Sequence, residues 1–334
     1  MLKVGLIGCG FMGGMHAACY KEIEGAQLVA VADVRAEKAD EMAKKYGVTE
    51  VFSTGKELIE KADVDIIDIC LPTFIHAEHA ELAMKKGVHV FIEKPVCLTK
   101  EEGERLLAIE KETGAKVQVG QVVRIWDEYV WLKNAVDSKE YGEIKSAVFQ
   151  RLSSTPTWGW ENWLHDPERS GSVALDLHIH DVDYMRYILG EPDSFTSVAE
   201  RNEKGVIEQI FTTFKYGKKV VTVEGCWDYP VDFPFEDGYR VKFEKATVVF
   251  KPGQGITVYP NEGGQIKPEI IPSFQGENDI GGNVSDLGGY YNELKYFVDR
   301  LSANEPLEIA PLSEAVKSVN LVLNEIESVG GAKI

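Results

Sequence analysis

Polar residues suited to proton transfer lie in two short segments of the sequence. Lys94 directly follows the apolar run 88–92, so a strand would carry its ammonium group to the end of a sheet, and Pro95 would fix the chain beyond it. Asp176 and His180 are spaced by one helical turn, which places them on one face of a helix. A carboxylate in that position can orient an imidazole and stabilise its protonated form, which suits a general base.

Both segments also fit a structural role. A glutamate and a lysine at a strand end, as at Glu93 and Lys94, often form an ordinary solvated ion pair, and a single histidine on a helix is as often a core residue. A metal site is a third interpretation, because His178, His180, Asp181 and Asp183 are close in sequence. On a helix, however, His178 and His180 point away from each other, so we expect no metal site there.

The elements that must position these groups begin with a glycine-rich turn. The apolar run 2–7 predicts a buried strand, residues 8–13 a tight turn, 14–24 a helix, and 27–32 a second strand that ends on Asp33. Gly8 permits the turn, Gly10 lets the backbone approach a pyrophosphate, and Gly13 lets the helix pack close to the sheet. The sequence therefore predicts a dinucleotide-binding unit.

Asp33 indicates which dinucleotide is bound. It lies at the end of the second predicted strand, about 20 residues beyond Gly13, where its carboxylate can accept hydrogen bonds from ribose hydroxyls and repel a 2′-phosphate. NAD is therefore the favoured cofactor. Arg35 keeps NADP as the alternative, because a guanidinium so close to Asp33 can neutralise a 2′-phosphate.

The alternation of strands and helices continues to residue 121 and then changes. Up to that point, short apolar runs are separated by amphipathic helices, which predicts a parallel, doubly wound α/β sheet. Beyond residue 126 we expect helices at 128–137, 173–189, 290–301 and 313–329, a strand at 144–152, and a series of strands between 195 and 259 joined by short turns. The expected domains are therefore 1–121 and 122–334, the second containing a mainly antiparallel sheet.

Composition narrows the classes of partner. The chain has 334 residues and a formal net charge of −18, which disfavours nucleic acid and strongly anionic substrates and favours a neutral substrate. Its five cysteines, Cys9, Cys19, Cys70, Cys97 and Cys226, lack the spacing of a metal finger and predict reduced core residues. Neither a leader nor a membrane-spanning run is apparent, so we expect a soluble, cytoplasmic protein with no nucleic-acid or membrane partner.

Several motifs occur together in one order. They are the turn Gly8 to Gly13 followed by His16, the segment Pro72-Thr73-Phe74-Ile75-His76, the tripeptide Glu93-Lys94-Pro95, and the pair Asp176 and His180 after Gly171. Together they resemble the glucose-fructose oxidoreductase and inositol 2-dehydrogenase (Gfo/Idh/MocA) family, and the segment 290–297 is similar to a late helix of that family. The glycine-rich segment before the family's catalytic helix is reduced here to Ser170-Gly171-Ser172.

This resemblance implies a Rossmann domain followed by an α+β domain with an open, mainly antiparallel sheet, whose exposed face commonly joins subunits into dimers or tetramers. It implies oxidation of a secondary alcohol of a sugar or polyol by NAD(P), with His180 as general base and a cis bond between Lys94 and Pro95. The implied catalytic set is Lys94, Asp176 and His180. The expected cofactor contacts are Gly8, Gly10, Phe11, Met12, Gly13, Asp33, Arg35, Leu71, Pro72, Thr73, His76, Glu93, Lys94 and Gln121. The expected substrate contacts are Lys94, Arg124, Trp158, Trp160, Asn162, His165, Asp176 and His180.

Other functions remain open at this point. The family also contains members that hold NAD tightly and use a transient oxidation to break a glycosidic bond, and members that reduce carbonyls of compounds other than sugars. A non-catalytic protein that senses NAD is the alternative from another class. A sensor does not need Lys94, Asp176 and His180 together, so the sequence favours an enzyme.

Overall fold

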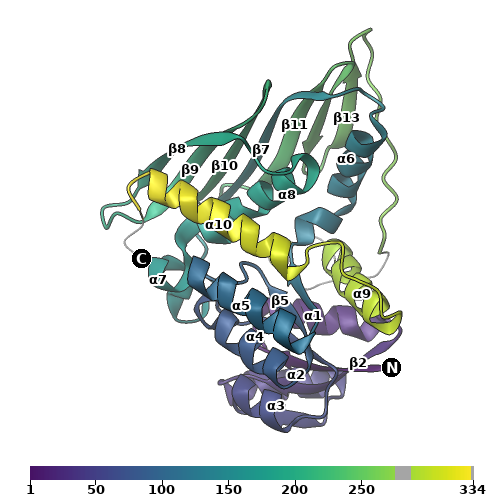
Figure 1. Ribbon diagram of the computed structural model, residues 1–334, viewed down its shortest axis with the longest axis vertical. Helices are drawn as coiled ribbons and strands as arrows, with labels where there is room; N and C mark the ends of the chain where they lie inside the picture. Colours follow the sequence, from purple (N-terminus) through teal and green to yellow (C-terminus); the bar gives the residue numbers. More distant parts are fainter. Residues whose placement is uncertain (275–286, 332–334) are drawn as a thin grey trace. The chain divides into compact units, whose positions relative to one another are not determined.

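The computed structural model describes residues 1–274 and 287–331, which form two compact units (Figure 1). The first unit contains Met1–Ile125 and Pro272–Lys317, and the second contains Trp126–Ile271 and Ser318–Ile334. The chain therefore returns to its first unit after completing most of the second. A division into the consecutive segments 1–121 and 122–334 does not describe this return.

The first unit is built on a parallel sheet. Its strands are β1 (Leu2–Ile7), β2 (Ala26–Ala32), β3 (Glu50–Phe52), β4 (Ile66–Ile69), β5 (His89–Glu93) and β6 (Val117–Gly120), in the spatial order β3-β2-β1-β4-β5-β6. Every neighbouring pair runs parallel. Ile66, Ile67, Val90 and Ile92 are completely buried, as expected for strands covered on both faces. The predicted doubly wound sheet is confirmed.

The helices of this unit begin and end at residues that the sequence makes recognisable. They are α1 (Phe11–Glu22), α2 (Ala36–Tyr46), α3 (Gly55–Lys61), α4 (His76–Lys85) and α5 (Lys100–Thr113). Thr54 and Thr99 cap α3 and α5 by accepting hydrogen bonds from backbone N–H groups. Gly47 and Gly114 end α2 and α5 in the left-handed conformation, which glycine adopts without steric cost.

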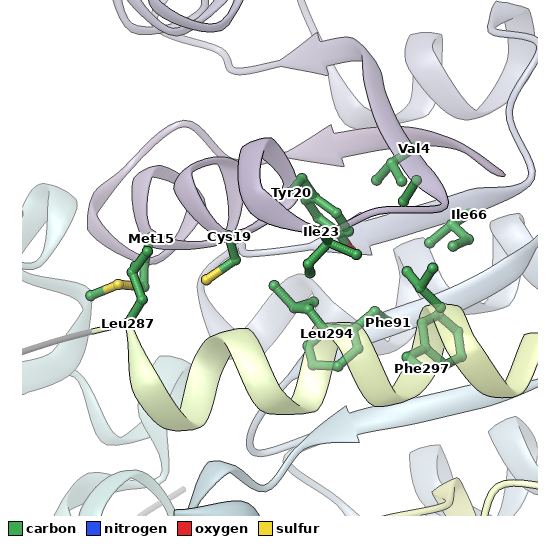
Figure 2. Packing of buried hydrophobic residues seen from close by; sticks show 12 residues of the cluster. Val4, Met15, Cys19, Tyr20, Ile23, Ile66, Phe91, Leu287, Leu294 and Phe297 are labelled. Carbon is green, nitrogen blue, oxygen red and sulfur yellow. The ribbon is translucent and has the colours of Figure 1, made fainter. Parts of the chain in front are cut away.

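A late helix, α9 (Gly288–Ser302), accounts for the return of the chain to the first unit. Figure 2 shows Leu294 and Phe297 of α9 in one cluster with Tyr20 of α1, Ile23 just after it, and Phe91 of β5. All five side chains are nearly inaccessible to solvent. Burial of a large apolar side chain stabilises a fold by about 1.5–3 kcal/mol, so this cluster holds α9 to the parallel sheet and its helices.

The second unit contains a larger, mixed sheet. Its strands are β7 (Ile144–Ser154), β8 (Ser194–Arg201), β9 (Ile207–Tyr216), β10 (Lys219–Tyr229), β11 (Glu236–Phe243), β12 (Ala246–Lys251) and β13 (Gly255–Pro260), in the order β13-β12-β11-β7-β10-β9-β8. Neighbouring strands are antiparallel except β7 and β10, which are parallel. Parallel neighbours cannot be joined by a hairpin. Here the chain leaves β7 through a long connection that contains helices, re-enters the sheet at β8, and reaches β10 only after β9. The mainly antiparallel sheet that we predicted is confirmed.

The two faces of this sheet differ in their surroundings. Helices α6 (Asp127–Ser138) and α8 (Ile179–Leu189) cover one face, where Tyr129 and Tyr184 make edge-to-face contacts with each other and Tyr184 with Phe149 of β7. On β10, Val221 is completely buried whereas its neighbour Val220 is 41% exposed, because alternate side chains of a strand point to opposite faces. Among the residues that the structure describes, no helix covers the second face, which is therefore open there.

The last helix of the described residues is α10 (Leu312–Ser328), whose residues from Ser318 onward belong to the second unit. Among the helices of the described residues, none combines the length and apolarity needed to cross a membrane.

Candidate functional site

The glycine-rich turn leaves β1 in the geometry that a dinucleotide requires. Gly8 has a φ of +98°, and a Cβ there would lie 2.4 Å from the carbonyl oxygen of Cys70. A Cβ on Gly13 would lie 1.8 Å from the carbonyl oxygen of Gly8, so only glycine allows α1 to pack this close to the turn. Gly10 precedes α1, and no side chain among the described residues caps the helix there.

The space beside Gly10 fits a phosphate-bearing ligand. A Cβ built on Gly10 would meet nothing closer than Arg35 Nη2, at 3.7 Å, among the described atoms. A helix N-terminus without a side-chain cap presents backbone N–H groups and the positive end of the helix dipole to an anion. The residues of this turn, Gly8, Gly10, Phe11, Met12 and Gly13, are therefore suited to hold the pyrophosphate of NAD.

Asp33 lies at the carboxyl end of β2 and is 7% exposed. It accepts hydrogen bonds from the backbone N–H groups of Cys9 and Arg35, both at 2.8 Å, and from the guanidinium of Arg35 at 2.9 Å. Burial raises the pKa of Asp33, but the hydrogen bonds from Arg35 and Cys9 outweigh it and lower the pKa below the usual value. Asp33 is therefore a carboxylate, held beside the glycine turn as the sequence predicts.

The loop after β4 is supported by a buried histidine. Leu71 and Pro72 are half-buried, Thr73 is buried and begins a 3₁₀ turn (Thr73–Ile75), and His76 begins α4. His76 is 1% exposed and places its ring between two carbonyl oxygens, with Nδ1 2.8 Å from Pro95 O and Nε2 2.6 Å from Leu71 O. His76 therefore links this loop to the loop after β5 through backbone atoms.

Lys94 is delivered by β5, as the sequence predicts. It is half-buried and follows Glu93, the last residue of the strand. The Lys94–Pro95 peptide bond is cis, which confirms the prediction. The backbone N–H of Lys94 donates to Glu93 Oε2 at 3.1 Å, while Pro95 O faces His76. The backbone on both sides of the Lys94 side chain is thus anchored to buried groups.

Asp176 and His180 belong to the second unit and lie on the predicted helix, both half-buried. The helix predicted over 173–189 differs in type at its start. Ala174–His178 form a π-helix, and the α-helix α8 begins only at Ile179. A π turn widens the helix and is frequent at functional sites. The helix extends to Leu189, as expected.

The first turn of this helix is anchored by residues that the sequence did not reveal. His178 is completely buried, and its Nε2 lies 2.9 Å from Glu325 Oε2 on α10. The hydroxyl of Thr212 on β9 donates to the same oxygen. Asp181 pairs with Arg151 at 3.0 Å, and Asp183 accepts a hydrogen bond from Ser318. Three of the four residues that we considered as a metal cluster, His178, Asp181 and Asp183, thus contact separate partners.

The reduced glycine segment before this helix forms a closed turn. Gly171 and Ser172 have positive φ values of 73° and 63°. The hydroxyl of Ser170 donates to Leu164 O at 2.8 Å and accepts from the backbone N–H of Ser172 at 3.0 Å. Hydrogen bonds of a buried serine therefore hold the shape of this short loop.

The remaining expected contacts occupy different environments. Gln121, an expected cofactor contact, and Arg124, an expected substrate contact, are each 2% exposed in the first unit, Arg124 within a 3₁₀ helix (Val122–Ile125). Four expected residues are exposed in the second unit, on the segment 155–165: Trp158, Trp160, Asn162 and His165. His165 also lines a surface hollow of about 440 Å³ together with Trp227.

The comparisons with known proteins agree with this architecture. Residues 2–121 match the model of an oxidoreductase family with an NAD-binding Rossmann fold, and residues 129–249 match the GFO/IDH/MocA C-terminal domain. The predicted NAD cofactor is thereby confirmed at the level of the family.

Individual relatives extend the comparison. The chain is 34% identical to the myo-inositol 2-dehydrogenase of Thermotoga maritima over 57% of this chain and 55% of that protein. It is also 34% identical to the inositol 2-dehydrogenase of Rhizobium meliloti, over 59% of this chain and 58% of that protein. The chain thus matches little more than half the length of these curated relatives.

The fold has a close structural counterpart. A levoglucosan dehydrogenase solved with NADH and levoglucosan superimposes with a TM-score of 0.86 at 20% identity, over 98% of this chain and 97% of that one. The two family models and this shared fold lead to one conclusion, which is that the chain belongs to the GFO/IDH/MocA family of oxidoreductases.

Proposed function

We propose that this protein is an NAD-dependent dehydrogenase that oxidises a secondary alcohol of a polyol or sugar ring. The observation that carries the proposal is the presentation of Lys94 on an anchored loop at the carboxyl end of β5. Because β1 and β5 belong to one parallel sheet, Lys94 and the glycine turn follow strand ends at the same edge. Ligands of such sheets bind at that edge.

Each residue of the proposed catalytic set has a defined task. NAD, when bound at the glycine turn and Asp33, supplies the chemistry of hydride acceptance. His180 takes the proton of the substrate hydroxyl, and Asp176 orients the imidazole and stabilises its protonated form. Lys94 donates a hydrogen bond to the reacting oxygen and stabilises the negative charge that develops there.

The substrate class follows from the charge and from the relatives. A net charge of −18 favours a neutral substrate over a phosphorylated one. The named relatives act on inositol, and the structural counterpart was solved with levoglucosan, which is also an uncharged polyhydroxylated ring. Trp158 and Trp160 are exposed, and indole faces suit the C–H surface of such rings.

The test is the absorbance of reduced nicotinamide after mixing the protein with NAD and a panel of inositols, aldoses, anhydrosugars and glycosides. We expect reduction of NAD by one class of ring. His180→Ala and Lys94→Ala should each lower kcat by about 100-fold or more while the Kd for NAD stays unchanged. Glu327→Gln, on an exposed residue of α10, is the control.

Other results would change the assignment. An equal loss of NAD affinity in His180→Ala or Lys94→Ala would contradict the roles given to these residues. Cleavage of glycosides without net reduction of NAD would replace the dehydrogenase with a redox-assisted hydrolase. NAD binding with neither reaction would indicate a sensor.

We also propose that the protein is a homo-oligomer joined through the open face of its second sheet. Val198 on β8 and Phe211 on β9 are direct neighbours on that face, and they are 63% and 36% exposed. Tyr259 on β13, 40% exposed, lies on the same face at the other end of the sheet. Exposed apolar side chains on an uncovered sheet favour association with a second copy.

A further inference from the structure

A cluster of ionisable side chains lies in the core of the first unit, beneath the loop that carries Lys94. His16 on α1 is completely buried, as is Asp68 on β4. Glu93 at the end of β5 is 7% exposed, and Glu293 on α9 is 2% exposed. Ionisable groups are seldom buried unless they are paired, because burial in an apolar environment penalises their charged forms. This cluster therefore needs an explanation that packing alone does not supply.

The contacts of the imidazole favour its doubly protonated form. His16 Nδ1 lies 2.9 Å from Asp68 Oδ2, and its Nε2 lies 3.1 Å from Glu93 Oε1. A carboxylate oxygen only accepts hydrogen bonds, whereas a neutral imidazole carries a single N–H. If both carboxyl groups are ionised, both contacts are hydrogen bonds only when both ring nitrogens are protonated, so the geometry favours an imidazolium at His16 that bridges two carboxylates.

Electrostatics support this assignment. Burial alone lowers the pKa of His16, but the charge of Asp68, with contributions from Cys70, outweighs it and places the pKa well above the usual value. On α9, Glu293 is the remaining acid that faces the ring. Burial, together with the charges of Glu93 and Asp68, raises the pKa of Glu293, which favours its neutral form. Tyr20 and Cys19 are the other ionisable groups of α1 in this core, and their pKa values are raised as well.

The bridge ends on the backbone of Lys94. Glu93 uses Oε1 for His16 and Oε2 for the backbone N–H of Lys94, at 3.1 Å. Its carboxylate also fits against Gly120 of β6, where a Cβ would lie 3.2 Å from Oε1. Both oxygens and the direction of the carboxylate are thereby fixed. A chain of hydrogen bonds leads from β4, through the ring on α1, to the peptide that carries Lys94.

We propose that His16 is a positioning residue for Lys94, acting as a buried cation that ties Asp68 to Glu93 and so fixes the loop of Lys94 and Pro95. This inference rests on the proposed function of Lys94, which it deepens. Without the imidazolium, the Glu93 carboxylate faces Asp68 and Glu293 in the core without a cation between them, and it turns away from the Lys94 N–H. A displacement of a catalytic group by about 1 Å can cost about 100-fold in rate.

The first experiment combines His16→Gln with Lys94→Ala in a double-mutant cycle. We expect His16→Gln to lower kcat by about 10- to 100-fold, with the Kd for NAD changed by less than about threefold. In the Lys94→Ala background, the same change should have no further effect on residual turnover, because the residue through which His16 acts is gone. His79→Gln is the matched control, since His79 is a buried histidine of the same unit whose Nδ1 faces the carbonyl oxygen of Ile75.

The second experiment does not depend on catalysis. NMR of ring ¹⁵N nuclei should show His16 with both nitrogens protonated at pH 8, and hydrogen exchange of the Lys94 amide should be faster in His16→Gln than in His79→Gln. A wild-type protein that reduces no NAD, with His16 still doubly protonated and the Lys94 amide still exchanging faster in His16→Gln, would contradict the proposed function. The same outcome would support the anchoring of the loop by His16.

Several results would overturn the inference. One is an unchanged kcat in His16→Gln. Another is an equal fold-loss of turnover when His16→Gln is introduced into the wild type and into Lys94→Ala, because a merely structural role would give this result. A neutral His16 ring at pH 8, or a stoichiometric metal ion in the purified protein, would contradict the hydrogen-bonded bridge itself.

Discussion

At the scale of single residues, we expect Asp33 and Arg35 to decide the choice of cofactor. The guanidinium of Arg35 occupies both oxygens of the Asp33 carboxylate in this structure. The ribose hydroxyls of NAD must share these oxygens with Arg35, whereas a 2′-phosphate would be repelled by the carboxylate and attracted by the guanidinium. The guanidinium of Arg35 is thus engaged by Asp33. We expect the Asp33 carboxylate to determine whether NAD or NADP is preferred.

We therefore expect Asp33→Ser to reverse the cofactor preference. Loss of hydrogen bonds to a charged group costs about 1.5–3 kcal/mol, so the Kd for NAD should rise by about 10- to 100-fold. The released Arg35 should lower the Kd for NADP. Fluorescence titration of both cofactors measures the change, and Asp33→Ser combined with Arg35→Met should lose the gain in NADP affinity. Unchanged NADP binding in the single variant would show that Arg35 takes no part.

The residues of the site differ in how readily the sequence reveals them and the side chains that they contact. The glycine turn, Asp33 and Lys94 each lie in a short motif that directly follows a predicted strand, so the sequence locates them. Asp68 interrupts an apolar strand, which is a visible signal of a buried partner, but its bond to His16 spans 52 positions. Residue types alone do not tell which distant side chain completes such a pair.

At the scale of elements, the π turn that carries Asp176 depends on a helix from the far end of the chain. Glu325 on α10 is 147 positions from His178 and accepts hydrogen bonds from it and from Thr212. The sequence predicts the helix 173–189 but not the π turn, because one additional residue per turn leaves the apolar pattern almost unchanged. Nor does the sequence indicate that Glu325 anchors this turn through His178.

We expect Glu325→Ala to destabilise the fold and to slow catalysis. The change leaves the buried His178 and Thr212 without their acceptor, which costs about 1–3 kcal/mol for each unsatisfied group. Glu325→Gln should lose less, since its amide oxygen still accepts a hydrogen bond. Urea denaturation measures the free energy of unfolding, and kcat reports on the π turn. Glu327→Gln on the exposed side of α10 is the control. Equal stability of Glu325→Ala and wild type would refute the anchoring.

At the scale of the whole molecule, the order of strands and helices was predictable and the assignment of segments to units was not. Local patterns locate the helices and strands to within a few residues, as for α9, which is expected at 290–301 and is observed at Gly288–Ser302. The return of α9 to the parallel sheet depends on Leu294 and Phe297 meeting α1, which lies far away in sequence. The parallel pairing of β7 with β10 likewise depends on the path of the chain between them.

The open face of the second sheet gives a prediction about assembly. Its uncovered residues include Val198 and Phe211, which are paired across β8 and β9. If a second copy covers this face, a charge placed there must be buried without a partner, which strongly disfavours association. We expect each of two single variants, Val198→Lys and Phe211→Glu, to lower the molecular mass measured by light scattering toward that of the monomer. The affinity for NAD should be retained in both. In Glu327→Gln the mass should stay that of the wild type. An unchanged oligomer in both sheet variants would assign the interface to another surface.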